Sequence, residues 1–250
     1  MQQYIIGNWK MNGTKSDAIK LASGLLKRTQ DATRPLPHII LCPSFPYLLP
    51  VAEILDENAV IDVGAQDSYP EPDGSFTGDI SLSQLKDVGC KYVLVGHSER
   101  RLYHHESSTL IKRKVEAALK AGLHPVLCVG ENAEERAQGH TLSVIAHQLV
   151  VDLPEDLSSH LLLIAYEPLW AIGSGQTPTA DQVEEVMGLI KHELAARVAG
   201  GAIIPTLYGG SVNAQNATQF LNLPHVDGLL VGGASLKADD FWQIVNASKR

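Results

Sequence analysis

The stretch LLLIAYEPLWAIGSG, from Leu161 to Gly175, combines an apolar run, one carboxylate and a glycine-spaced loop. The run Leu161–Ala165 has the length and composition of a buried strand. Glu167 follows where this strand would end, and Pro168 favours an extended backbone at Glu167 and stiffens the start of the loop. This order predicts a catalytic base at the end of a strand, followed by a hinged lid.

Similar apolar runs recur along the chain, and amphipathic stretches separate them. The strand-like runs are Tyr4–Ile6, His38–Cys42, Val60–Ala65, Tyr92–Val95, Pro125–Val129, Leu161–Ala165, Ile203–Tyr208 and Gly228–Val231. The helical stretches include Ser16–Lys27, Ser107–Ala121, Thr179–Ala199 and Asp239–Ala247. Such alternation indicates an α/β fold of parallel strands joined by crossover helices, and wholly apolar runs are typical of strands covered on both faces. Eight units in 250 residues favour a single-domain (β/α)8 barrel with a parallel eight-stranded barrel over residues 1–250, with a doubly wound open sheet as the alternative.

The composition excludes several classes of function. The net charge of −8 argues against general affinity for nucleic acid, although a local site can still bind a phosphorylated substrate. No apolar run approaches the ~20 residues of a membrane span, and the start of the chain lacks the pattern of a signal peptide. The three cysteines, Cys42, Cys90 and Cys128, are widely spaced, which suggests neither a disulfide framework nor a zinc site. A reducing cytoplasmic setting is therefore expected.

Polar motifs follow the strands at the places where a (β/α)8 barrel carries its functional residues. Gly7-Asn8-Trp9-Lys10 follows the first run, and Gly96-His97-Ser98-Glu99-Arg100-Arg101 follows the fourth. Asn8, Lys10, His97 and Glu167 are therefore predicted to meet at the barrel mouth. Three of them have an ordinary alternative: Lys10 as a solvated lysine, His97 as a structural histidine and Glu167 as a carboxylate in an ion pair. Because His97 would begin a helix, whose dipole disfavours added positive charge, we expect its imidazole to be neutral.

Two glycine pairs indicate a phosphate site. Gly209-Gly210-Ser211 follows the seventh run, and Gly232-Gly233 follows the eighth. Barrel enzymes commonly hold phosphate in the loops after those two strands, with backbone N–H groups and a short helix N-terminus. One glycine pair alone mostly means a turn, so the signal comes from both pairs lying in the expected loops.

These motifs together resemble the signature of the triosephosphate isomerase family, over nearly the whole chain. The resemblance implies a cytoplasmic isomerase with a TIM barrel that interconverts dihydroxyacetone phosphate and D-glyceraldehyde 3-phosphate through an enediolate, in glycolysis and gluconeogenesis, without a metal or an organic cofactor. Glu167 would transfer the carbon-bound proton, His97 would serve the substrate oxygens, and Lys10 and Asn8 would stabilise the oxyanion and contact the substrate. The further phosphate contacts that it implies are Gly173, Ser211, Gly232 and Gly233.

The resemblance also assigns supporting residues. Glu99 would belong to a charged network around the histidine loop. The segment Gln66–Gly78 is long for a loop in a compact domain, and such loops are usually functional. The resemblance implies that it inserts into a neighbouring subunit of a homodimer, with Thr77 near the partner's Lys10.

Two other functions remain as alternatives. One is a barrel isomerase or aldolase that acts on another sugar phosphate, although an aldolase would use a desolvated lysine on a later strand and these strand ends offer none. The other is a catalytically silent phosphate-binding barrel, which would be expected to lack Glu167 or His97.

Overall fold

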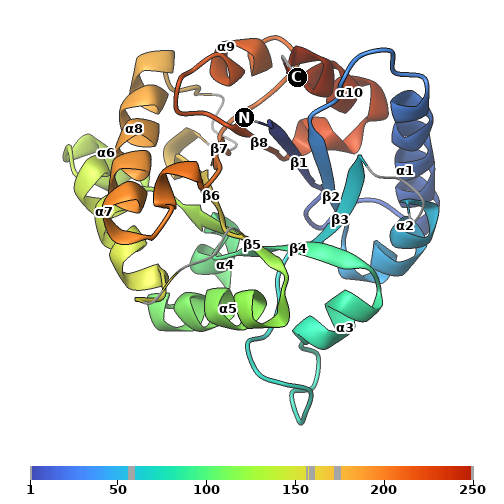
Figure 1. Ribbon diagram of the computed structural model, residues 1–250, viewed down its shortest axis with the longest axis horizontal. Coiled ribbons are helices and arrows are strands. Elements are labelled where there is room, and N and C mark those ends of the chain that lie inside the picture. Colours follow the sequence, from blue (N-terminus) through green and yellow to red (C-terminus); the bar gives the residue numbers. More distant parts are fainter. Residues whose placement is uncertain (1, 56–59, 156, 158–160, 172–175, 249–250) are drawn as a thin grey trace.

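Eight parallel strands pair in chain order, and β8 returns to pair with β1, so the sheet closes into a barrel (Figure 1). This computed structural model describes residues 2–55, 60–155, 157, 161–171 and 176–248. The strands are β1 Tyr4–Asn8, β2 His38–Cys42, β3 Ile61–Ala65, β4 Cys90–Val95, β5 His124–Val129, β6 Leu163–Tyr166, β7 Thr206–Tyr208 and β8 Gly228–Val231. The closed barrel confirms the predicted (β/α)8 fold and excludes the open sheet.

Helices cover the outside of the barrel (Figure 1). They are α1 Lys15–Gln30, α2 Leu48–Leu55, α3 Leu82–Asp87, α4 Ser98–Tyr103, α5 Ser108–Ala121, α6 Ala133–Ala137, α7 Thr141–Asp152, α8 Ala180–Arg197, α9 Ala217–Leu221 and α10 Ala238–Ala247. Short 3-10 helices are η1 Phe45–Tyr47, η2 Leu169–Ala171, η3 Gly201–Ile203 and η4 Gly233–Leu236. Capping boxes fix the starts of α1 at Thr14 and of α8 at Thr179, since each hydroxyl accepts a backbone N–H of the first turn.

The strands are buried on both faces, which is why their sequences are continuous apolar runs. One apolar cluster, which includes Ile6, Ile40, Leu94 and Val126, fills the barrel interior. A larger cluster joins the outer faces of the strands to the helices. This packing leaves the polar residues that follow each strand at one rim of the barrel.

The seventh strand begins later than its apolar run predicts. The run starts at Ile203, but that residue ends η3, and β7 begins at Thr206. Pro205 lies between them and has no N–H to donate to a neighbouring strand, so pairing through its N–H is impossible. β6 likewise begins at Leu163 rather than Leu161. These shifts leave the functional ends of the strands unchanged.

The segment between β3 and α3 extends away from the body of the barrel (Figure 1). It contains the predicted loop Gln66–Gly78, and a single bridge between Tyr69 and Ser81 joins its two ends. Within the described ranges, no helix combines the length and apolar character needed to cross a membrane.

Candidate active site

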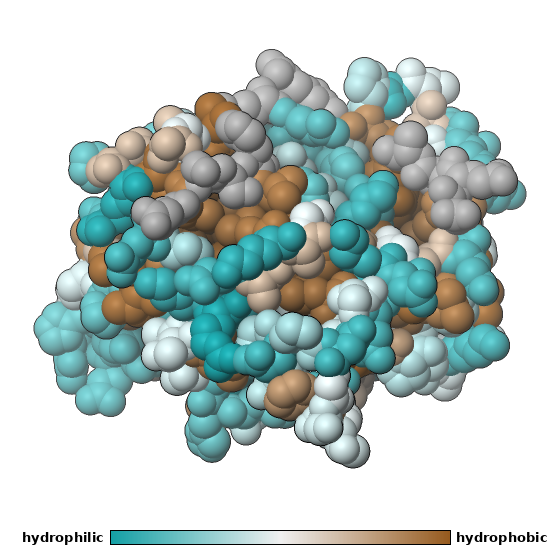
Figure 2. All heavy atoms as spheres, turned by 60° about the horizontal axis from the view of Figure 1, so that its bottom comes forward, coloured by the Kyte–Doolittle hydropathy of each residue, from teal (hydrophilic) through white to brown (hydrophobic). Residues whose placement is uncertain are grey.

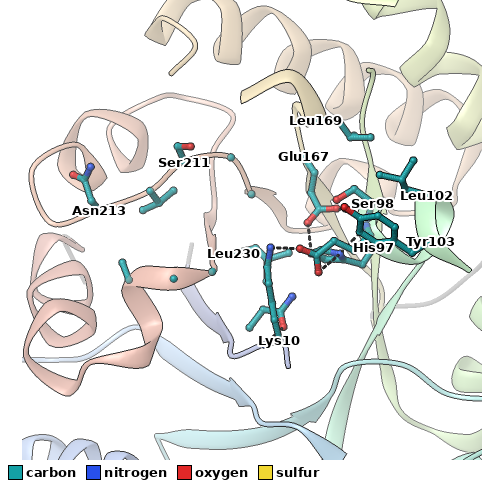
Figure 3. Close-up of a pocket in the computed structure, with 18 residues that line it drawn as sticks. Lys10, His97, Ser98, Leu102, Tyr103, Glu167, Leu169, Ser211, Asn213 and Leu230 are labelled. Carbon is teal, nitrogen blue, oxygen red and sulfur yellow. Dashed lines mark hydrogen bonds and ion pairs between the residues drawn. The ribbon is translucent and has the colours of Figure 1, made fainter. Parts of the chain in front are cut away.

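A cavity of about 680 Å³ opens at the rim formed by the carboxyl ends of the strands (Figure 3). Its lining comes from β1, the loop after β4, β6 and the loops after β7 and β8. The predicted residues in this lining are Asn8, Lys10, His97, Glu99, Glu167, Ser211, Gly232 and Gly233. The structure therefore brings together eight predicted residues from five separate segments of the chain.

Glu167 directly follows β6 and is only 2% exposed. Its Oε1 lies 2.9 Å from Nε2 of His97, and its Oε2 accepts the backbone N–H of Ser98 at 2.9 Å. Burial raises the pKa of this carboxyl group, but His97, the Ser98 N–H and Lys10 together hold the pKa below its usual range. Glu167 is therefore a buried carboxylate that stays ionised, as a general base must be.

His97 lies at the start of α4 and is almost completely buried. Its Nδ1 accepts the N–H of Glu99 at 3.2 Å, which leaves Nε2 as the nitrogen that faces Glu167. Burial lowers the pKa of His97, but the Glu167 carboxylate outweighs burial and raises the pKa above its ordinary value. This direction is opposite to the one expected from the helix dipole, because the sequence argument did not include a carboxylate arriving from β6.

Lys10 adopts a left-handed backbone conformation, with φ of 53°, which is rare for a residue with a side chain. Its N–H donates to Oδ1 of Asn8 at 3.0 Å, and its carbonyl accepts the hydroxyl of Ser44 at 2.7 Å. Its ammonium group lies 2.5 Å from the Glu99 carboxylate, as the dashed line in Figure 3 marks. The positive charge of Lys10 is thus directed into the cavity.

The two glycine-containing loops lie on the same cavity. The hydroxyl of Ser211 donates to the carbonyl of Ala171 at 2.7 Å, which joins the loop after β7 to the segment after β6. The Lys10 side chain passes close to Gly232, since a Cβ at Gly232 would lie 3.4 Å from Lys10 Cε. A Cβ at Gly233 would meet nothing within 4 Å. Gly173, the fourth predicted phosphate contact, lies outside the described residues.

Gly130 supports Glu167 and was not among the residues predicted from the sequence. A Cβ at Gly130 would lie 1.8 Å from the carbonyl oxygen of Glu167, so only glycine fits there. The Glu167 N–H donates to the carbonyl of Val129, the residue before Gly130, at 2.7 Å. Gly130 directly follows a predicted strand, and that position is the signal that could have found it.

A second cavity, of about 560 Å³, shares Lys10 and Tyr103 with the first. Its lining includes Met11, Phe45, Gln66 and Tyr103. Thr77 is exposed on the protruding loop and lines neither of these two cavities of the described chain. Within its own chain, Thr77 is therefore not part of the site.

The described part of the chain contains no cluster of three or more histidine, cysteine or acidic side chains that could hold a metal ion. The site instead offers a buried carboxylate, an imidazole, an ammonium group and glycine-rich loops. These groups suit proton transfer on a small phosphorylated molecule.

Comparison with known proteins gives one consistent family. The sequence model of the triosephosphate isomerase family matches residues 3–248. A triosephosphate isomerase of Acidiphilium cryptum is 43% identical over 258 residues and covers 100% of both chains. One from Xanthobacter flavus is 45% identical over 247 residues, covering 97% of this chain and 96% of the relative. The crystal structure of a triosephosphate isomerase from Bartonella henselae superposes with a TM-score of 0.89 at 38% identity, covering 99% of each chain.

Proposed function

Since this chain belongs to the triosephosphate isomerase family and interconverts dihydroxyacetone phosphate and glyceraldehyde 3-phosphate, a step of glycolysis, we propose that Glu167 is the base of this reaction. The observation that carries the proposal is the buried, ionised carboxylate of Glu167 beside His97, at the mouth of the barrel. The same reaction in the reverse direction serves gluconeogenesis.

Glu167 removes a proton from the substrate carbon next to the carbonyl group. The electron pair of that C–H bond forms the carbon–carbon double bond of an enediolate, and the carbonyl oxygen takes up the negative charge. Glu167 then returns the proton to the adjacent carbon, while His97 gives a proton to the former carbonyl oxygen and takes the proton of the neighbouring hydroxyl, which becomes the new carbonyl group. Glu167 Oε1 lies 2.9 Å from Nε2 of His97, so the group that moves the carbon-bound proton is next to the group that serves the substrate oxygens.

His97 serves the oxygen atoms of the substrate. Nδ1 accepts the Glu99 N–H, so Nε2 carries the proton that can be donated to the substrate oxygens. Lys10 and Asn8 stabilise the developing oxyanion, since an ammonium group and an amide that are already fixed in place act on the charge as it develops. Lys10 also neutralises part of the phosphate charge, which the overall net charge of −8 would otherwise oppose.

The phosphate group binds between the loops after β7 and β8. Ser211, Gly232 and Gly233 supply this cradle, together with Gly173. The absence of side chains at the two adjacent glycines lets phosphate oxygens approach the backbone N–H groups at the start of η4.

We also propose that the chain forms a single domain over residues 1–250 and acts as a cytoplasmic homodimer. The second cavity, beside Lys10, is lined by large apolar residues: Met11 is 95% exposed and Tyr103 is 70% exposed. The protruding loop that carries Thr77 is available to fill this second cavity on another copy of the chain (Figure 1). Figure 2 shows hydrophobic and hydrophilic residues intermixed on the face turned forward. Three buried free cysteines are compatible with a reducing compartment.

Isomerisation in deuterated water tests the proton route. Wild-type protein is expected to place solvent deuterium on the carbon that receives the proton, because the Glu167 carboxyl group exchanges with solvent between the two transfers. The variant Glu167→Gln should place deuterium on product and on recovered substrate roughly 10²–10⁴-fold more slowly than the wild type. Product formed by the wild type entirely without deuterium would contradict this route.

A further inference from the structure

Arg101 belongs to the histidine motif but has no role in the proposed reaction, and its guanidinium group makes three hydrogen bonds. Nε donates to the carbonyl of Gly96 at 2.7 Å. Nη2 donates to the carbonyl of Cys128 at 2.8 Å and to Oδ2 of Asp152 at 2.7 Å. One side chain from α4 thereby connects the end of β4, the strand β5 and the end of α7.

Asp152 is the last residue of α7, yet it is 0% exposed. A carboxylate that is withdrawn from water is costly unless a cation pairs with it, and the pair itself contributes little net stability compared with an apolar replacement. Its Oδ1 has no hydrogen-bond partner among the described residues, so the contact with Arg101 is the interaction that offsets its burial. Holding Arg101 in one orientation is the evident consequence of this arrangement.

The first carbonyl that Arg101 binds belongs to the peptide group that leads into His97. Gly96 has φ of +65°, a conformation that residues with a side chain adopt rarely. A Cβ at Gly96 would lie 2.9 Å from Nη2 of Arg101 and 3.1 Å from Ile111. Glycine at position 96 therefore allows both the turn of the backbone and the close approach of the guanidinium group.

The second carbonyl belongs to a residue beside the base. Cys128 lies on β5, which pairs with β6 so that Cys128 is opposite Ala165, two residues before Glu167. The Cys128 thiol is fully buried, and burial together with the Glu167 charge raises its pKa well above the ordinary value. Arg101 is thus bound to the carbonyl that directly precedes His97 and to the carbonyl of the β5 residue that precedes Val129, the partner of the Glu167 N–H.

We propose that Arg101, oriented by Asp152, is a positioning residue that fixes the His97 imidazole relative to Glu167. Neither side chain lines the cavity, so both act through the backbone of β4 and β5. The proposal rests on the role of His97 in the reaction. Small displacements of catalytic groups are expensive in rate, and a shift of ~1 Å can lower turnover on the order of 10²-fold.

The variant Arg101→Lys tests the proposal, because an ammonium group keeps the charge but cannot bind three acceptors in the plane of a guanidinium group. We expect kcat to fall on the order of 10²-fold. We expect KM to stay within about twofold, since the phosphate cradle is untouched. In nitrogen-15 NMR spectra of the folded variant, the His97 ring signals should shift from their wild-type positions. The control Arg197→Lys changes an arginine paired with Glu193 on α8 and should leave all three quantities unchanged.

Asp152→Asn provides a second variant in case Arg101→Lys does not fold. The amide is almost the same size and can still accept one hydrogen bond from Arg101, but it removes the charge that orients the guanidinium group. A smaller loss of kcat and a ring shift in the same direction are expected. Unchanged His97 ring signals in a folded variant would overturn the positioning role. Shifted ring signals with unchanged kcat would instead contradict the catalytic role of His97, so the two failures can be told apart.

Discussion

Gly130→Ala is a perturbation whose effect can be worked out from distances. The new Cβ would lie 1.8 Å from the Glu167 carbonyl oxygen, 2.8 Å from its carbonyl carbon and 2.9 Å from Leu169 Cδ1. Two of these atoms are backbone, so a side-chain rotation cannot relieve the collision. The backbone at the end of β6 or at the end of β5 must move instead.

The size of the movement follows from ordinary contact distances. Contacts of a Cβ normally begin near 3.4 Å, so the carbonyl oxygen must recede by about 1.6 Å. Forcing extra atoms into a packed region typically destabilises a protein by about 1–3 kcal/mol. A shift of this size at the catalytic base should lower kcat on the order of 10²-fold. Substrate affinity should change little, because the phosphate loops lie after β7 and β8.

Steady-state kinetics of the wild type and the variant give the change in kcat, and urea unfolding gives the change in the free energy of unfolding. Gly24→Ala is the matched control: its Cβ would meet Arg28 and Ala238 at 3.4 and 3.6 Å, which are ordinary contacts, and Gly24 lies inside α1. That control should keep full activity and be stabilised by up to about 1 kcal/mol through helix propensity. A folded Gly130→Ala variant with wild-type kcat would refute the claim that the packing of Gly130 sets the position of Glu167.

Three further outcomes are expected. Replacing Pro70–Phe76 by a short turn should yield a folded monomer with much lower turnover, because Thr77 would no longer pack beside Lys10 of the partner subunit and hold it in position; full activity in a demonstrably monomeric variant would disprove this dependence of activity on the dimer. Gly233→Val should raise KM without changing the free energy of unfolding, since its side chain would enter open space in the phosphate cradle; an unchanged KM would place the phosphate elsewhere. The pKa of Glu167 is lowered in the folded protein, so its charge stabilises the fold at pH values above 4.5, and this stabilisation is lost as the pH falls through the folded pKa. The pKa of His97 is raised in the folded protein, so its protonation stabilises the fold at pH values below 6.5, and this stabilisation is lost as the pH rises through the folded pKa. Unfolding free energy should therefore gain most from the pair between these two values, and His97→Gln should remove the gain; identical pH profiles for variant and wild type would count against the pair.

The barrel fold and the residues at its mouth could be predicted from the sequence. Parallel strands buried on both faces have uninterrupted apolar sequences, so the polar residue that follows each apolar run marks the functional rim of the barrel. Glu167, His97 and Asn8 were found in this way. The apolar run from Ile203 set the start of β7 too early, because an apolar run does not distinguish residues of η3 from residues of the strand.

Interactions between distant segments were the part that sequence could not supply. The environment of His97 depends on a carboxylate 70 positions later in the chain, which reverses the direction of its pKa shift. The contact of Arg101 with Asp152 likewise joins residues 51 positions apart. Residue spacing predicts which side chains meet along one helix or one strand. These two contacts join separate elements and form only when the barrel closes.

The role of Glu167 is tested most directly by the turnover of Glu167→Gln, measured beside its affinity for an unreactive phosphate-bearing analogue of the substrate. The amide keeps the size of the side chain but cannot accept the carbon-bound proton. Loss of a positioned general base should lower kcat by roughly 10²–10⁴-fold, while the affinity for the analogue is retained because the phosphate cradle is intact. If a folded Glu167→Gln protein keeps kcat within about threefold of wild type, the loss is far smaller than a missing general base would cause, and Glu167 is not the base of the reaction.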